Sequence, residues 1–228
     1  MDHILSVRAE GFSTFTIKTA GQREEYSSII FLEPFDWRNK RAFGFDMWSN
    51  EMRRNAMARA RDTGEASTSG IITLVQETST DVQRGFLTYL PLYRNGMPVD
   101  TVDQRREAIV GWVYSPFRMG DLMKGILGGG ETNVEYEIFD GIELTKDALL
   151  FDSNDIFHAE DAEHADVSLR KTTLSLQDRT WTIVYTAGGN QLTEAERAQP
   201  TIVAAAGLVV DLLLFYIFNV YCVDAATG

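Results

Sequence analysis

Residues 44–64 read GFDMWSNEMRRNAMARARDTG, and this stretch decides the first part of the fold. Ser49 is a natural helix N-cap, and Gly64 suits the left-handed position that follows a helix. Between them apolar side chains recur at four-residue spacing: Met52, Ala56 and Ala60. That spacing places them on one helical face, with arginines on the others. The stretch therefore predicts a helix that begins after Ser49 and ends near Gly64.

Short runs of β-branched and aromatic residues on both sides of this helix predict β-strands. The strands are expected at residues 11–17, 26–32, 71–75, 86–90 and 109–114. Thr101 and Gln104 form a capping box, which predicts a short helix before the last of these strands. A further helix is expected at 121–127. This part of the chain therefore predicts a mixed α/β fold.

Gly128, Gly129 and Gly130 mark the clearest internal boundary. After them apolar and polar residues alternate over 134–138, which indicates a half-buried strand. Residues 169–176 and 180–185 predict a second hairpin around a turn at 177–179. The fold class is therefore α/β of the α+β type, with antiparallel sheets in two units, residues 1–127 and 131–190.

Residues 201–223, TIVAAAGLVVDLLLFYIFNVYCV, are almost wholly apolar. About 20 such residues are what a helix needs to cross a bilayer. Asp211 favours a buried core helix instead, because an Asp at the bilayer centre costs about 2.5–3.5 kcal/mol on insertion scales. The strongly apolar neighbours offset that cost. The run therefore predicts a transmembrane helix, with a core helix as the alternative.

The acidic composition narrows the classes of partner. The formal net charge is −12, and residues 131–166 hold twelve acidic residues against Lys146. No stretch forms a basic face, so nucleic acid is not expected as a partner. The single cysteine, Cys222, lies in the apolar run, so the rest of the chain has no disulfide, as in the cytosol or in a large periplasmic domain. Residues 1–4 lack the features of a secretory signal, so either the domain is cytoplasmic or a targeting segment lies upstream.

One loop gathers side chains that can bind a transition metal. It contains His158, Glu160, Asp161, Glu163 and His164. Their spacing matches no standard site, so a solvated acidic loop is the preferred interpretation. A calcium loop from Asp152 fails at Ile156 and Phe157. The sequence also contains no nucleophile elbow, Walker loop, HExxH or CxxC motif, so we expect no metal, no cofactor and no catalysis.

Several separated motifs give the chain a family resemblance. Besides 44–64, they are Arg38-Asn39, Thr68-Ser-Gly70, Leu74-Val-Gln-Glu77, Tyr89-Leu-Pro-Leu-Tyr93 and Gly111-Trp-Val-Tyr-Ser-Pro-Phe-Arg118. In this order they resemble the CHASE domain, the extracytoplasmic ligand-binding module of membrane histidine kinases and diguanylate cyclases, which plant cytokinin receptors also carry. The resemblance covers most of Arg8 to Leu127. It implies two PAS-like subdomains that lie between two transmembrane helices.

The resemblance also implies a ligand site. In the cytokinin receptors an Asp in a Leu-Asp-Met-Met-Ser run hydrogen-bonds the adenine-like ligand, and Asp46 matches it here. Capping of the following helix is an equally good interpretation of Asp46. The receptors use the backbone of a leucine where this chain has Thr68, a departure that leaves the ligand open. The candidate pocket walls are Trp48, Phe86, Tyr89 and Trp112, although each also suits a core.

These patterns predict a small-molecule-binding sensor region of a membrane receptor, with its soluble part in the periplasm and residues 201–223 in the membrane. The expected partners are a small ligand, for which an adenine-like compound is one candidate, the membrane and a second copy of the chain. The alternative is a structural dimerisation module that binds no ligand. The chain contains no kinase or cyclase, so we expect a sensory fragment of a larger receptor or a truncated gene product.

Overall fold

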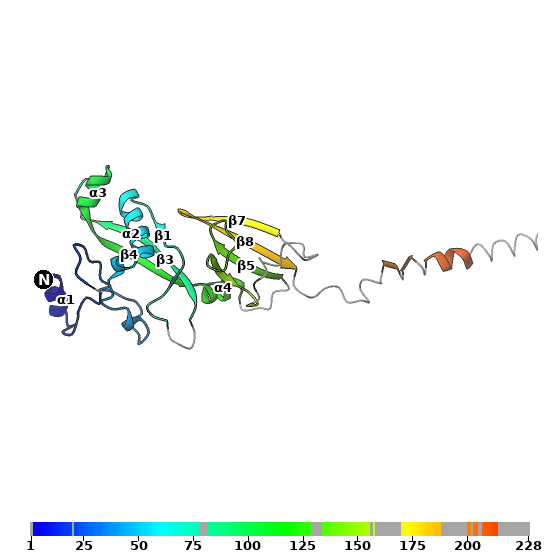
Figure 1. Ribbon diagram of the computed structural model, residues 1–228, viewed down its shortest axis with the longest axis horizontal. Coiled ribbons are helices and arrows are strands. Elements are labelled where there is room, and N and C mark those ends of the chain that lie inside the picture. The colour runs from blue at the N-terminus through cyan, green and yellow to red at the C-terminus, as the bar shows by residue number, and fades with distance from the viewer. Residues whose placement is uncertain are drawn as a thin grey trace, which may run out of the picture. The chain divides into compact units, whose positions relative to one another are not determined.

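The computed structural model describes residues 2–19, 21–77, 82–128, 134–155, 157, 170–187, 200–201, 203–204 and 207–213. By its internal contacts the chain divides into two units, Met1–Thr186 and Ala187–Gly228. Both sheets that the described residues form belong to the first unit (Figure 1). The mixed α/β class with antiparallel sheets is therefore confirmed.

The first sheet is built around strand β3, Arg84–Tyr93. Strand β4, Ile109–Arg118, pairs with it in antiparallel register on one side. On the other side two short strands, β1 (Ser67–Thr68) and β2 (Ile72–Thr73), pair with successive parts of β3. The expected strands at 86–90 and 109–114 thus lie inside longer ones, whereas the one at 71–75 is shorter than expected.

Helix α2, Glu51–Thr63, is the predicted helix, and it packs against β3. Gly64 ends it in the left-handed conformation, as expected. The N-cap differs by one residue, because the Asn50 side chain, not Ser49, accepts the Arg53 backbone N–H. Ser49 instead closes the short helix η2, Met47–Ser49.

The buried face of α2 also differs from the expected one. Met52 is 43% exposed, while Arg53 is buried with Ala56, Met57 and Ala60. Ala56, Met57 and Ala60 pack against Leu87 and Tyr89 of β3 in the first hydrophobic core. The four-residue spacing therefore predicted the helix and the burial of Ala56 and Ala60 correctly, whereas the expected burial of Met52 was wrong.

The remaining helices are α1 (Asp2–Ala9), η1 (Asn39–Arg41), α3 (Val102–Ala108) and α4 (Met119–Leu127). Helix α3 begins at the predicted capping box, in which Thr101 and Gln104 exchange side-chain and backbone hydrogen bonds. Helix α4 covers the helix that was expected at 121–127.

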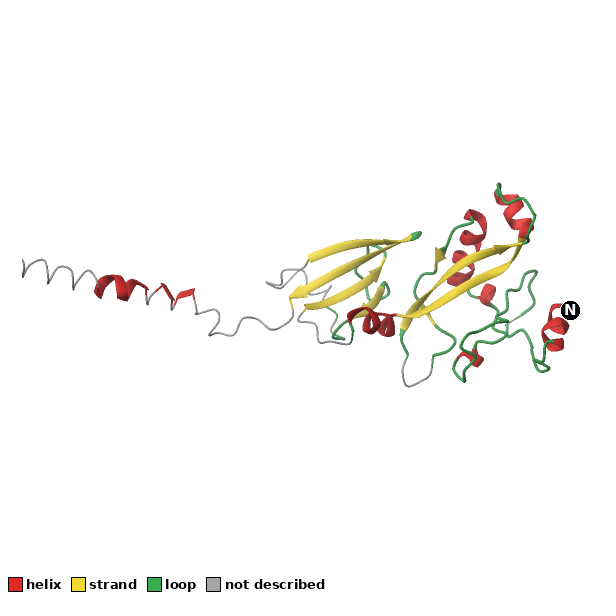
Figure 2. Ribbon diagram, turned by 180° about the vertical axis from the view of Figure 1, so that it is seen from behind, coloured by secondary structure: helices red, strands yellow, loops and turns green. Residues whose placement is uncertain are grey.

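The second sheet has the strand order β6-β5-β8-β7. Figure 2 shows the strands of the protein in yellow. Its strands are β5 (Val134–Asp140), β6 (Leu149–Asp152), β7 (Arg170–Leu176) and β8 (Arg179–Ala187). A two-residue turn, Gln177-Asp178, joins β7 to β8 at the predicted hairpin. The predicted strands at 109–114 and 180–185 therefore lie in different sheets.

Two expected strands are absent from the N-terminal part that the structure describes. Residues 11–17 form no bridge, the adjoining Lys18 bridges to Phe45, and 26–32 form only an isolated bridge from Ser28 to Asp46. The bonds run to the short stretch 44–47, which is too short to support a full strand ladder. Phe15 and Ile29 are buried by packing instead, so the strand prediction was wrong there.

The structure describes only part of the apolar run 201–223. Residues 200–201, 203–204 and 207–213 are helical. Among the described residues, no helix has both the length and the apolar character that a bilayer crossing requires. The transmembrane helix stays a prediction.

Candidate functional site

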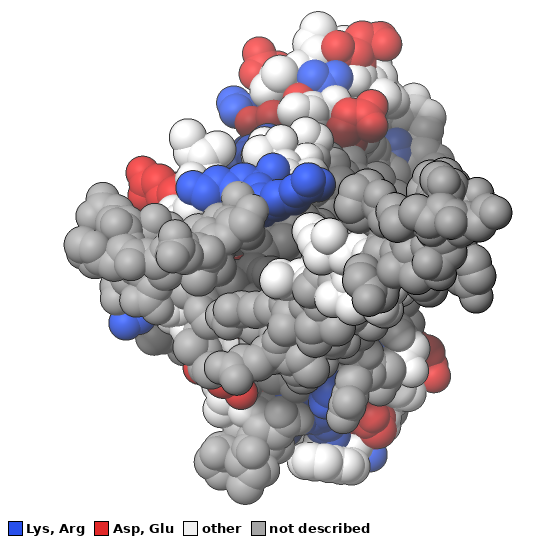
Figure 3. Space-filling model, turned by 90° about the vertical axis from the view of Figure 1, so that its right-hand side faces the viewer, with Lys and Arg blue, Asp and Glu red and all other residues white. Residues whose placement is uncertain are grey.

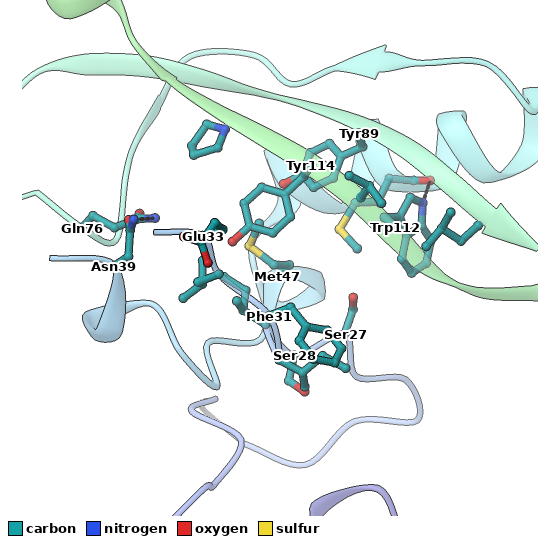
Figure 4. A pocket seen from close by; sticks show the side chains of 17 residues that line it. Ser27, Ser28, Phe31, Glu33, Asn39, Met47, Gln76, Tyr89, Trp112 and Tyr114 are labelled. Carbon is teal, nitrogen blue, oxygen red and sulfur yellow. Dashed lines mark hydrogen bonds between the residues drawn. The ribbon is translucent and has the colours of Figure 1, made fainter. Parts of the chain in front are cut away.

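A cavity of about 280 Å³ lies between the first sheet, helix α2, helix η2 and the segment of residues 27–33 (Figure 4). Its volume is just below the range of about 300–1,000 Å³ that is typical for small-molecule sites. Apolar side chains make up much of its wall, among them Ile29, Leu32, Met47, Met57, Leu92 and Trp112. A cavity of this kind can surround the apolar body of a compact ligand.

Besides Ser27, Ser28, Glu33, Asn39 and Gln76, the polar residues of the cavity wall include a pair of tyrosines. Tyr89 of β3 and Tyr114 of β4 stand directly opposite each other in the antiparallel register, with ring centroids 6.0 Å apart. Both hydroxyl oxygens are buried, and neither has a hydrogen-bond partner among the described residues. Buried polar groups almost always have partners, so this pair is unusual.

Burial keeps both phenols protonated. It raises the pKa of Tyr114 to about 12 and raises the pKa of Tyr89 still further. The charge of Arg53 acts in the opposite direction but is the smaller effect on either pKa. At neutral pH the cavity therefore contains two O–H groups that can each donate a hydrogen bond.

Arg53 does not line the cavity itself, but it supplies a buried positive charge that acts on both phenols. Its guanidinium donates from Nη2 to the carbonyl oxygen of Thr73 at 3.1 Å and stacks 5.0 Å above the ring of Phe45. Burial lowers its pKa, and no carboxylate among the described residues pairs with it. A buried cation without a counter-ion makes this region favourable for negative charge.

Asp46, the expected ligand contact, does not line the cavity. Its side chain is fully buried, and its carboxylate accepts hydrogen bonds from the backbone N–H groups of Ser27 (2.9 Å) and Trp48 (3.2 Å). The Arg23 guanidinium pairs with its other oxygen. Asp46 thus caps η2 and ties residues 23–27 to it, which is the alternative interpretation. Ligand contact by Asp46 stays a prediction.

Thr68 lies in β1, also fully buried and outside the cavity wall. Its backbone N–H donates to Asp178 Oδ1 at 2.9 Å, and its hydroxyl bonds to Gln177 and Thr88. Thr68 therefore connects the first sheet to the β7–β8 turn of the second.

The four aromatic candidates separate into three places. Tyr89 and Trp112 line the cavity, and the indole N–H of Trp112 donates to the Met57 carbonyl at 3.0 Å. Trp48 stacks against Trp112, with centroids 5.6 Å apart, on the wall of a neighbouring, more open depression. Phe86 instead belongs to the core of the second sheet, where it packs against Trp181.

Sequence reasoning missed Tyr114. Tyr114 is two residues from Trp112 on the same strand, so period-two alternation could have placed both on one face. Arg53 was placed with the other arginines outside the buried face of the helix, because an arginine on a helix is usually exposed.

The possible metal-binding loop at 158–164 lies outside the described residues. Elsewhere, within the part of the chain that the structure describes, no group of three or more His, Cys, Asp or Glu side chains is placed to hold a metal ion. On the face shown in Figure 3, basic and acidic side chains are interspersed over the described surface.

The chain belongs to the CHASE domain family, whose model matches residues 1–151. CHASE domains are extracytoplasmic and sensory, not catalytic, so this chain contains an extracytoplasmic sensor region. Among solved structures it is similar to the periplasmic sensory domain of the Campylobacter jejuni chemoreceptor Tlp1. The identity is 10% and the TM-score 0.40, over 64% of this chain and 57% of that chain.

Proposed function

We propose that this chain is the ligand-binding part of a membrane signal-transduction receptor, of the kind that ends in a histidine kinase or a diguanylate cyclase. The observation that carries the proposal is the cavity of about 280 Å³ inside the matched domain, with its apolar walls and three buried hydroxyls, those of Ser28, Tyr89 and Tyr114, that have no partner among the described residues. Cavities with a few convergent polar groups are the usual form of a small-molecule site.

Two structural features support a route for the signal. Strand β3 forms part of the cavity wall and also pairs with strand β1. Strand β1 is in turn hydrogen-bonded to the β7–β8 turn of the second sheet. A ligand that moves the β3–β4 pair would therefore act on the second sheet through Thr68 and Asp178. In the proposed receptor the chain beyond β8 passes the change to a transmembrane helix at 201–223.

A second candidate function is dimerisation without a ligand. It is favoured by exposed apolar side chains of the β3–β4 pair that do not line the cavity, Leu90 and Val110. A second copy of the chain is the partner that this alternative requires.

A ligand screen with a cavity-filling variant tests the proposal. The full chain in detergent is screened by thermal shift, because a ligand that binds only the folded state raises its melting temperature. Ser27→Phe places a ring in the cavity, and Ser13→Phe makes the same change at an exposed position outside it. We expect binders whose shift is lost in Ser27→Phe and kept in Ser13→Phe. A screen in which every shift survives Ser27→Phe would contradict the proposal.

A further inference from the structure

The chemistry of the cavity restricts the class of ligand, given the proposed function that it binds one. Tyr89 is 1% exposed, and its hydroxyl has no hydrogen-bond partner among the described residues. The Tyr114 hydroxyl is in the same situation and points toward Met47 and the segment that carries Glu33 (Figure 4). Burying two such groups costs free energy unless a bound molecule completes their hydrogen bonds.

A phenol can donate or accept a hydrogen bond, so the neighbouring charge decides which role is used. Arg53 is buried beside both tyrosines, and none of the described carboxylates neutralises it. Its charge favours a bound group with negative or partly negative oxygen. Glu33 also reaches the cavity, but it is exposed at the rim, where water screens its charge.

The rest of the wall accepts an apolar body. Ile29 and Met47 are buried in the first core, and Met57 and Trp112 complete the same surface. The volume of about 280 Å³ exceeds the roughly 150 Å³ of a dry apolar cavity that binds benzene. A molecule with one ring or a short branched chain, plus one small polar group, fits this space.

We propose that the cavity binds a compact, largely apolar molecule whose polar end is a hydrogen-bond acceptor, a carboxylate or a carbonyl oxygen, held by the hydroxyls of Tyr89 and Tyr114 beside Arg53. The protein is the donor in this arrangement. A ligand recognised through Asp46 would be the donor instead, so the two assignments predict opposite chemistry at the polar end.

Matched probes separate the possibilities. The carboxylates are benzoate and phenylacetate, the ketones are acetophenone and phenylacetone, and the amines are benzylamine and phenethylamine. Binding to the full chain in detergent is measured by calorimetry and thermal shift. We expect the carboxylates and ketones to bind and the amines not to bind. If the carboxylates bind more tightly than the ketones, the positive charge of Arg53 contributes to binding. If both bind equally well, a carbonyl oxygen is sufficient as the acceptor.

The variants Tyr89→Phe and Tyr114→Phe each remove one hydroxyl and keep the ring. We expect each to weaken the binding of an acceptor probe about tenfold or more, as for a hydrogen bond to a charged group. Without ligand, neither should melt below the wild-type protein, because the hydroxyl that is removed has no partner. Tyr136→Phe is the control, since Tyr136 lies in the core of the second sheet, and it should leave probe affinity unchanged.

Three outcomes overturn the inference. They are no binding of any acceptor probe, amines that bind as well as the acids, and unchanged affinity in both tyrosine variants. If library compounds still bind in a way that Ser27→Phe abolishes, the sensor function stands and only the ligand class is wrong. If nothing binds at all, the proposed function fails as well.

Discussion

The backbone N–H of Thr68 donates to the carboxylate of Asp178 across 2.9 Å, which bonds strand β1 of the first sheet to the β7–β8 turn of the second. The Ser67 hydroxyl donates to the same carboxylate at 2.9 Å, and Arg59 of α2 pairs with it. One side chain therefore joins two elements of the first sheet region, β1 and α2, to the second sheet.

Asp178→Ala should lower the free energy of unfolding by about 1–3 kcal/mol, because it leaves the buried N–H of Thr68 without an acceptor. Glu65→Ala, at an exposed position of the same region, is the control and should change it by less than about 0.5 kcal/mol. Urea unfolding of both variants gives the comparison. Equal stabilities would show that the two sheets do not depend on this contact.

That contact shows where sequence reasoning ends. Thr68 and Asp178 are 110 residues apart. Nothing in the sequence around either residue indicates that the two form a hydrogen bond. By contrast, the caps at Thr101 and Gly64 are local, so both were predicted correctly from neighbouring residues. The sequence was therefore a good guide to elements that local chemistry determines.

The errors have physical causes of the same kind. Residues 26–32 have strand-like composition, but the stretch they bond to is too short for a ladder. In the site, Tyr89 and Trp112 were expected as wall residues and line the cavity. Tyr114 was not expected, although strand register places it opposite Tyr89. Cavities form where several elements meet, and tertiary packing decides which side chains face them.

Asp62 should titrate far below an ordinary carboxyl group. The Arg106 guanidinium donates hydrogen bonds to both oxygens of the Asp62 carboxylate, at 3.0 and 2.6 Å. Together with Arg61, it lowers the pKa of Asp62 to about 2, because this effect is larger than the opposite effect of partial burial. A carboxyl pKa that folding depresses adds stability above the unfolded value of about 3.9, and this stability is lost as pH falls through the folded value. Stability should thus decline from about pH 4 to pH 2.

Carboxyl-carbon NMR of Asp62 measures its titration directly. The variant Asp62→Asn should show a smaller loss of stability between pH 4 and pH 2 than the wild-type protein. A midpoint near 4 for Asp62 would contradict the pairing with Arg106.

Gly44 should tolerate no side chain. Its φ is +79°, and a Cβ there would overlap the carbonyl oxygen of Thr16. Gly96 has a similar φ of +81° but open space around it. Gly96→Ala should therefore cost about 1 kcal/mol, for the left-handed backbone alone, and Gly44→Ala clearly more. Urea unfolding midpoints decide this, and equal losses would mean that the Thr16 contact is unimportant.

The apolar run 201–223 should hold the chain in a membrane. When it is expressed in bacteria behind an export signal, we expect the protein to remain in the membrane fraction after carbonate extraction at high pH. Deletion of 201–228 should release a folded, soluble domain, because residues 1–186 form a compact unit of their own. If the shortened protein does not fold, the run is a core helix, which was the alternative interpretation.

Asp46→Asn distinguishes the two roles that the sequence left open for this residue. In the structure the carboxylate accepts bonds from the N–H groups of Ser27 and Trp48 and pairs with Arg23. Asparagine keeps one acceptor oxygen for the cap but loses the ion pair. Because a bond to a charged group contributes about 1.5–3 kcal/mol, we expect the free energy of unfolding to fall by an amount of that order.

The effect on ligand binding should be different, because Asp46 is not part of the cavity wall. We expect affinity for any ligand that Ser27→Phe excludes to change less than about twofold, once the variant is shown by circular dichroism to be folded. Direct contact predicts the reverse, since the loss of a charge-assisted hydrogen bond would weaken binding by about 1.5–3 kcal/mol, which is roughly tenfold or more. Titrating the folded wild-type and variant proteins with the same compound gives the answer. A tenfold loss of affinity with little change in stability would restore Asp46 to the ligand site and would require Arg23 to move aside on binding.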